Sequence, residues 1–269
     1  MGVERENARE AFRLIRKEPP GQFGLVLGLY ALSCKERELG KVARSSYFFM
    51  RHMDDLLDGD MKTGVNPLPY ALEVRRQIET DDFPGTPSIS TLADYSIRTL
   101  NSRSREGDNP RKDFLTEIDS IIFDHERSKE RRVLAEVELD EYYWRTFSPV
   151  VNILLIGLKS QLRAKDIPAL SISQGRLYTI RDLGTDWQRG IINIPQEVLN
   201  TAGLNRNSSI EQLRQNQLLQ DWFRKQAAIS KEELIPLQKQ IKETGEGLTL
   251  AICNHLIRWM IDFSHKQTS

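Results

Sequence analysis

Hydrophobic side chains recur at steps of three and four residues along most of this 269-residue sequence. The pattern is strongest over residues 42–57, 114–123, 133–158 and 248–263, and it is typical of helices that bury one apolar face. Strand-like alternation is scarce, and no Asn-Gly or Asp-Gly turn separates two β-rich runs. The sequence therefore predicts an all-α fold of roughly eight to ten helices, some of them long.

Proline and glycine cluster at short breaks between the helical stretches, at residues 19–21, 64–69, 84–87, 107–110 and 202–209. None of these breaks is long enough to be a domain linker. Long helices with apolar interior faces and a few inward carboxylates favour a helical bundle with a central cavity. We therefore expect residues 1–269 to form a single domain of this kind.

Basic and acidic residues balance, with 38 of each, so the formal net charge is zero. Such a chain has no general attraction to nucleic acid or to anionic membranes, and it carries no nucleic-acid motif. Cys34 and Cys253 lie far apart and fit neither a metal site nor a disulfide framework, as is typical of reduced thiols in the cytoplasm. The longest apolar runs are shorter than the ~20 residues that a membrane-spanning helix needs. We expect a cytoplasmic protein without a transmembrane segment.

A first cluster of carboxylates is Asp54-Asp55-Leu-Leu-Asp58. Asp54 and Asp58 are four residues apart, so they project from one helix face, and like charges at this spacing repel each other. A hard divalent cation such as Mg²⁺, which takes oxygen ligands, would offset that repulsion. The alternative is an acidic helix end exposed to solvent.

A second cluster repeats this spacing with Asp182 and Asp186, directly after a helical stretch at residues 172–180. One such pair is a weak signal, but two pairs in one all-α chain allow two carboxylate faces to oppose each other across a cavity. Three arginines lie beside the clusters, Arg51, Arg181 and Arg189, and forked hydrogen bonds from them suit a diphosphate. The alternative for each arginine is a salt bridge at the protein surface.

This arrangement of charges predicts a chemistry. Mg²⁺ and guanidinium groups stabilise the negative charge on a departing diphosphate, and the carbon left behind is an allylic cation. Such a cation needs a dry, apolar cavity lined by aromatic rings. Candidate rings are Tyr47, Phe48, Phe49, Tyr142, Tyr143, Trp144 and Phe147. Ordinary core packing is the alternative role for most of them.

Two stretches of the sequence resemble motifs of the squalene/phytoene synthase family. Residues 46–59, Ser-Tyr-Phe-Phe-Met-Arg-His-Met-Asp-Asp-Leu-Leu-Asp-Gly, are similar to its first aspartate-rich motif. Residues 180–199 begin Ile-Arg-Asp-Leu-Gly-Thr-Asp and continue through Arg-Gly to Ile-Pro, where phytoene synthases have Leu-Arg-Asp-Val-Gly-Glu-Asp, Arg-Gly and Leu-Pro. A weaker third match runs from Phe114 to Asp124 and is followed by a basic stretch at residues 127–132.

The resemblance implies the all-α fold of class I isoprenoid synthases. It also implies Mg²⁺ bound by two pairs of aspartates, Asp54 with Asp58 and Asp182 with Asp186. Arg51 and Arg181 would contact the diphosphate, with Asp124 nearby. Asp55 is also a motif position and is counted with the metal residues, although its place next to Asp54 turns it toward another side of the helix.

The sequence departs from the family around the expected substrate channel. The family's Ser-Phe pair near the N-terminus corresponds to Gln22-Phe23, without the hydroxyl. The family's glycine-containing channel helix reads Tyr-Tyr-Trp-Arg-Thr-Phe-Ser-Pro-Val-Val at residues 142–151, so Phe147 and Pro149 add bulk. Tyr178 takes the place of an asparagine and lies one turn before Asp182. We therefore expect a reshaped channel and a shorter prenyl donor.

Three functions are compatible with these features. The first is a Mg²⁺-dependent prenyltransferase of isoprenoid (terpene) biosynthesis, which ionises an allylic isoprenyl diphosphate and transfers the prenyl group to a second small molecule. That acceptor is either another prenyl diphosphate or, in phytoene-synthase-like variants, an aromatic compound outside the isoprenoids. The second is a terpene cyclase acting on one diphosphate, and the third is a non-catalytic assembly protein of the same fold. Both aspartate pairs are kept, which argues against the third function, and we expect the first.

Overall fold

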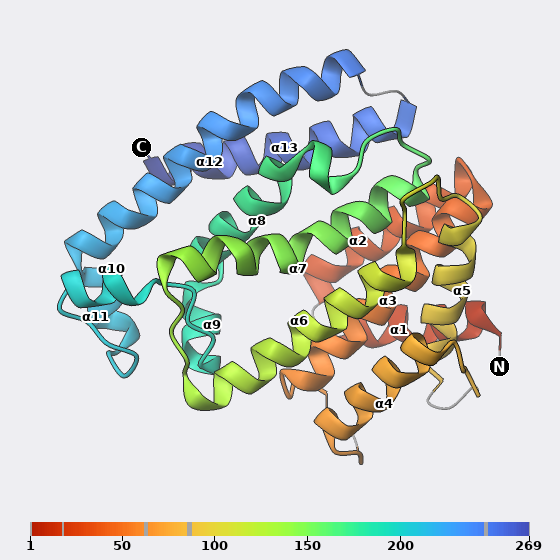
Figure 1. The fold of residues 1–269 in the computed structure, drawn as a ribbon, viewed down its shortest axis with the longest axis horizontal. Coiled ribbons are helices and arrows are strands. Elements are labelled where there is room, and N and C mark those ends of the chain that lie inside the picture. The colour runs from red at the N-terminus through yellow and green to blue at the C-terminus, as the bar shows by residue number, and fades with distance from the viewer. Residues whose placement is uncertain (1, 18, 62–63, 85–87, 245–246, 269) are drawn as a thin grey trace. The chain divides into compact units, whose positions relative to one another are not determined.

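In a computed structural model the chain folds almost entirely into helices (Figure 1). The structure describes residues 2–17, 19–61, 64–84, 88–244 and 247–268. The helices are α1 (Val3–Lys17), α2 (Pro19–Ala31), η1 (Leu32–Cys34), α3 (Arg37–Leu57), α4 (Pro67–Thr80), α5 (Ser90–Asn101), α6 (Pro110–Glu130), α7 (Glu136–Gly157), η2 (Ala164–Asp166), α8 (Pro168–Arg181), α9 (Leu183–Arg189), α10 (Gln196–Thr201), α11 (Ile210–Gln215), α12 (Gln217–Thr244) and α13 (Gly247–Thr268).

The predicted all-α fold is confirmed. Within the described ranges, extended pairing is limited to an isolated parallel bridge between Val133 and Ile192. The expected number of helices was too low, because α9, α10 and α11 are each only six or seven residues long and carry too little periodicity to be recognised. No helix in the described part of the chain is both long enough and apolar enough to cross a membrane.

Contacts divide the chain into two compact units, with boundaries inside α6 and α7. The first unit comprises residues 1–122 and 152–159. Its core forms around the helical stripe of α3, where Phe48, Phe49 and Met53 are fully buried. Phe49 meets Phe114 of α6 with ring centroids 5.5 Å apart. Because each buried ring contributes roughly 1.5–3 kcal/mol, this stripe fixes α3 and therefore the direction of the aspartates at its end.

The second unit comprises residues 123–151 and 160–269. Its long helices α12 and α13 lie side by side, and both contact α8 (Figure 1). One core cluster gathers around Trp187 of α9 and Phe223 of α12, and another lies around Tyr143 of α7. The prediction that all 269 residues act as one domain stays a prediction.

Two glycines allow close approach beside the second aspartate pair. Gly190 ends α9 with φ +86°, and a Cβ there would collide with the carbonyl oxygen of Ser128. Gly175 lets α8 pack against the ring of Tyr143 in the same way, and the Tyr143 hydroxyl pairs with Thr179 Oγ1 at 2.7 Å. These contacts fix α8 and α9 against α7 and the end of α6.

Candidate active site

The first aspartate motif lies at the C-terminal end of α3. Asp54 is in the last turn with its side chain 40% exposed, and Asp58 caps the helix. The amide of Asp58 donates to the carbonyl of Asp54 at 2.9 Å, so the expected one-turn spacing is present. Arg51 Nη1 donates to Asp54 Oδ2 at 2.9 Å. Asp54 and its arginine are therefore adjacent and accessible.

Asp55 has a different environment from its neighbour Asp54. Its side chain is 0% exposed. Three cations of the described residues pair with it, Arg13 at 2.5 Å, Lys17 at 3.0 Å and Arg51 at 2.9 Å. A step of one residue turns the side chain by about 100°, which directs Asp55 inward to α1. The buried charge is thus compensated by protein cations.

A second buried contact joins α1 to α3. Glu10 Oε1 lies 3.0 Å from His52 Nδ1, and Arg13 Nε donates to Glu10 Oε2 at 2.7 Å. Burial by itself would raise the pKa of the Glu10 carboxyl, but hydrogen bonding and charge from His52 and Arg13 outweigh it and lower that pKa. Glu10 is therefore held in its ionised form among these partners.

The second aspartate motif lies where α8 ends and α9 begins. Asp182 forms this junction with φ −99° and ψ 7°, so the helix is interrupted there. The amide of Asp186 still donates to the carbonyl of Asp182 at 2.9 Å, which keeps the pair one turn apart. Arg181 donates to both carboxylate oxygens of Asp182, at 2.8 and 2.6 Å.

Asp186 has the strongest electrostatic signal of the second motif. Burial, followed by the negative charges of Asp182 and Asp124, raises the pKa of Asp186 to about 7. Arg127 and Arg189 act in the opposite direction without cancelling the effect. Three carboxylates are therefore within electrostatic range of one another, and a cation among them would relieve the repulsion.

Asp124, the end of the third motif, is held rigidly. Arg127 Nε donates to one of its oxygens at 2.6 Å, and the Tyr142 hydroxyl donates to the other at 2.9 Å. The Arg127 side chain is 1% exposed, and it also donates to Asn193 Oδ1 at 2.6 Å. Its guanidinium lies 4.5 Å from the centre of the Tyr142 ring. Burial, and then the charge of Asp124, raise the pKa of Tyr142 well above its ordinary value, so the phenol stays a donor.

Aromatic rings form a continuous series beside Asp182. Phe147 meets Tyr178 edge to face at 5.6 Å, and Tyr178 meets Trp259 at 6.0 Å. Trp259 stacks on Phe263 at 5.9 Å. The Arg181 guanidinium lies 3.7 Å from the centre of the Tyr178 ring, which fixes the arginine between an aromatic face and Asp182.

The predicted site residues are divided between the two units. Arg51 joins the first motif in one unit, where Tyr47 packs against Phe48 and the core. The second unit holds the other predicted site residues, Asp124, Tyr142, Phe147, Tyr178, Arg181, Asp182, Asp186 and Arg189. Sequence reasoning missed Arg13, Lys17, Trp259 and Phe263. The only local signal was the four-residue spacing of Trp259 and Phe263 on one face of α13.

The donor atoms suit a hard cation. All of the predicted ligands are carboxylate oxygens, which Mg²⁺ and Ca²⁺ prefer, and the raised pKa of Asp186 marks a place where positive charge is lacking. In the part of the chain that the structure describes, no three His, Cys, Asp or Glu side chains form a ready-made metal cage. Mg²⁺ seldom uses such a cage, because it keeps waters and takes further ligands from substrate phosphates.

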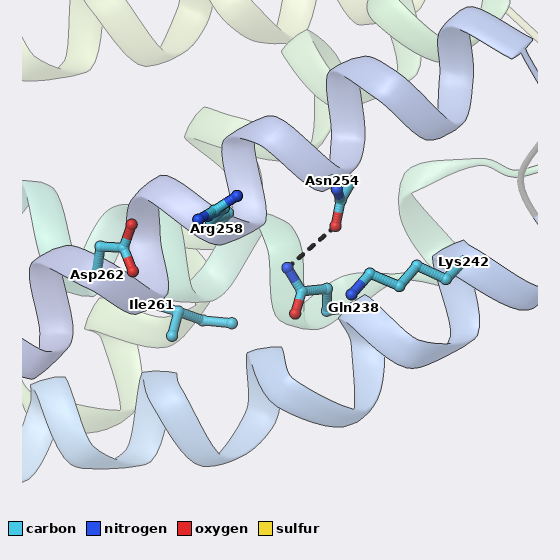
Figure 2. Close-up of a pocket in the computed structure, with 6 residues that line it drawn as sticks. All are labelled: Gln238, Lys242, Asn254, Arg258, Ile261 and Asp262. Carbon is cyan, nitrogen blue, oxygen red and sulfur yellow. Dashed lines mark hydrogen bonds between the residues drawn. The ribbon is translucent and has the colours of Figure 1, made fainter.

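A groove of about 260 Å³ opens between α12 and α13 (Figure 2). Gln238 Nε2 donates to Asn254 Oδ1 at 3.0 Å inside it. Its lining consists of Gln238, Lys242, Asn254, Arg258, Ile261 and Asp262. None of them is a predicted site residue, and the polar lining does not suit an apolar prenyl chain. The two aspartate motifs are therefore the better candidates for the chemistry.

The helical fold and paired aspartates define a class of isoprenoid synthases. The family model for squalene/phytoene synthase matches residues 30–256, and the chain therefore belongs to the squalene/phytoene synthase family. Members of this family are prenyltransferase-type enzymes that bind isoprenyl diphosphates. A comparison with curated proteins gives no match. Helix α1, Trp259 and Phe263 all lie outside the matched residues.

Proposed function

We propose that this chain is a Mg²⁺-dependent prenyltransferase that ionises an allylic isoprenyl diphosphate and passes the prenyl group to a second small molecule. The observation that supports this most is the partly buried carboxylate of Asp186, which lies one turn from Asp182 and whose pKa is raised to about 7. A carboxyl in this state gains stability when a divalent cation arrives, because the cation replaces the proton and offsets the charges of Asp182 and Asp124.

In this proposal each aspartate pair would hold Mg²⁺. Asp54 and Asp58 form one pair, and Asp182 and Asp186 form the other. When bound, the metal supplies Lewis-acid stabilisation of the negative charge on the departing diphosphate. Asp55 supports the first pair from inside the protein, since its charge is already compensated by three cations among the described residues.

Three arginines bind the diphosphate in this proposal, Arg51, Arg181 and Arg189. The Arg181 side chain is already ordered in the structure, because its guanidinium packs on the Tyr178 ring and donates two hydrogen bonds to Asp182. With substrate bound, the forked donors of Arg181 would pair with phosphate oxygens, and Asp182 would be one of the residues that hold the metal. Arg51 would change partners in the same way, since its Nη1 donates to Asp54 Oδ2 in the structure.

The aromatic residues protect the allylic cation from water and limit the length of its chain. Phe147 and Tyr178 pack edge to face at 5.6 Å, and Pro149 is buried in the same helix as Phe147. Packed side chains do not yield readily to extra methylenes. A donor shorter than geranylgeranyl diphosphate therefore fits best. Tyr142 of the second unit and Tyr47 of the first stay predicted substrate contacts.

Product analysis with purified protein tests this proposal. The protein is incubated with Mg²⁺ and dimethylallyl, geranyl, farnesyl or geranylgeranyl diphosphate, each alone and with aromatic acceptors, and released diphosphate and organic products are both measured. We expect Mg²⁺-dependent diphosphate release and a coupled product, both lost in Asp54→Asn and Asp182→Asn. A cyclised product from a single donor would indicate a cyclase. No turnover of any donor, with no binding of diphosphate, would indicate a non-catalytic relative.

A further inference from the structure

Helix α1 lies outside the residues that match the family, yet it binds the first aspartate motif directly. Arg13 Nη1 donates to Asp55 Oδ2 at 2.5 Å, and Lys17 Nζ donates to Asp55 Oδ1 at 3.0 Å. The two cations are one turn apart on α1 and reach the same buried carboxylate. Part of the positive charge that compensates Asp55 in the matched segment therefore comes from α1, which precedes that segment.

Arg51 is shared between two neighbouring carboxylates. Its Nη1 lies 2.9 Å from Asp54 Oδ2, and its Nη2 lies 2.9 Å from Asp55 Oδ1. A buried carboxylate that loses a partner is strongly destabilised and takes up whatever positive charge remains in reach. Removal of the α1 cations would therefore draw Arg51 toward Asp55 and away from the exposed side of the motif, where Asp54 lies.

Lys17 also holds the turn that follows the motif. Its amine donates to Asp60 Oδ2 at 2.7 Å in addition to Asp55. The amides of Asp60 and Met61 both donate to the carbonyl of Asp55, at 2.9 and 3.1 Å. Asp58 lies between Asp55 and Asp60 in the sequence, so Lys17 bonds to residues on both sides of it.

We propose that α1 positions the first aspartate motif, with Arg13 and Lys17 neutralising Asp55 so that Arg51 stays available at the exposed side of α3. Arg13 and Lys17 are positioning residues in this inference, because they act through Asp55 and Arg51 and do not touch a ligand. The inference rests on the proposed function, since it assumes that Arg51, Asp54 and Asp58 bind Mg²⁺ and diphosphate.

Binding of inorganic diphosphate in the presence of Mg²⁺, measured by calorimetry on the full chain, tests this role without a known acceptor. Lys17→Met removes the charge, and Lys17→Arg restores it. Arg16→Met is the matched control, because it removes a charge from an exposed neighbour on the same helix. Both lysine variants are also made in an Asp55→Asn background. If Lys17→Met does not fold, Lys17→Gln takes its place and keeps a hydrogen-bond donor without the charge.

We expect Lys17→Met to weaken diphosphate binding roughly tenfold, and Lys17→Arg and Arg16→Met to stay near wild type. In the Asp55→Asn background the same change should have little further effect, because Lys17 acts through that carboxylate. Equal effects of Lys17→Met and Arg16→Met, or an undiminished effect in the Asp55→Asn background, would overturn the positioning role alone. A wild-type protein that does not bind diphosphate with Mg²⁺ would overturn the proposed function and the positioning role with it.

Discussion

Tyr142 of α7 donates a hydrogen bond of 2.9 Å to Asp124 of α6. The other carboxylate oxygen of Asp124 accepts a hydrogen bond from Arg127. Asp124 in turn adds to the negative potential at Asp186. The Tyr142 phenol therefore helps to hold one of the charges that act on Asp186.

Tyr142→Phe tests this relationship. The substitution keeps the ring and removes the donor, so we expect a loss of about 1.5–3 kcal/mol in the free energy of unfolding, the usual range for a hydrogen bond to a charged group. Because Asp124 becomes less fixed, Mg²⁺-dependent diphosphate release should also fall. Urea denaturation and a diphosphate assay measure the two effects. An unchanged midpoint of unfolding would show that the hydrogen bond contributes nothing.

Asp186→Asn should stabilise the metal-free protein at pH 8. The pKa of Asp186 is raised to about 7 in the folded state, so between its ordinary pKa and 7 the folded protein keeps a proton that the unfolded chain releases. Stability therefore falls as the pH rises through this window, and the full cost is present above pH 7. The rise in the pKa of Asp186 from 3.8 to about 7 sets an upper limit of about 4 kcal/mol on this cost in the free energy of unfolding.

Urea denaturation of Asp186→Asn and of wild type at pH 5 and pH 8, both in EDTA, measures this difference. The gain should be larger at pH 8, where wild-type Asp186 is ionised. The same variant should lose Mg²⁺-dependent activity. A destabilised variant at pH 8 would mean that the charge of Asp186 is better compensated than the structure indicates.

Phe147→Ala should shift the donor preference toward longer chains. The ring fills space against Tyr178, and its removal opens room for several methylenes, each contributing about 0.8 kcal/mol when buried. Competition between farnesyl and geranylgeranyl diphosphate gives the ratio of kcat/KM values directly. If the wild-type protein prefers geranylgeranyl diphosphate and Phe147→Ala leaves that preference unchanged, the channel is not shortened at this position.

Mg²⁺ and an unreactive diphosphate analogue should raise the melting temperature together by more than the sum of their separate effects. Ligands that bind only the folded state stabilise it by mass action, and here each would complete the coordination of the other. A thermal scan with each ligand alone and with both gives the comparison. Additive shifts would argue against a shared site, and Asp182→Asn should abolish the excess.

Local spacing was sufficient for much of the site. Asp54 and Asp58 were predicted to share a helix face, and the hydrogen bond between their backbones shows the one-turn relation. Asp182 and Asp186 keep the same bond. The break between α8 and α9 was not predicted, because the four-residue spacing of these aspartates continues across it and gives no sign of an interruption. Their roles as metal ligands stay predictions.

The sequence by itself determined the long helices, the family motifs and the spacing of the carboxylates, since each depends on residues within a few positions of one another. Only the tertiary structure decided which carboxylate is buried. Arg13 and Lys17 reach Asp55 across 42 and 38 residues, and Trp259 of α13 meets Tyr178 of α8. Helix geometry turns Asp55 away from Asp54. The positive charges of Arg13 and Lys17 reach Asp55 because α1 packs on α3, and no local sequence pattern encodes that contact.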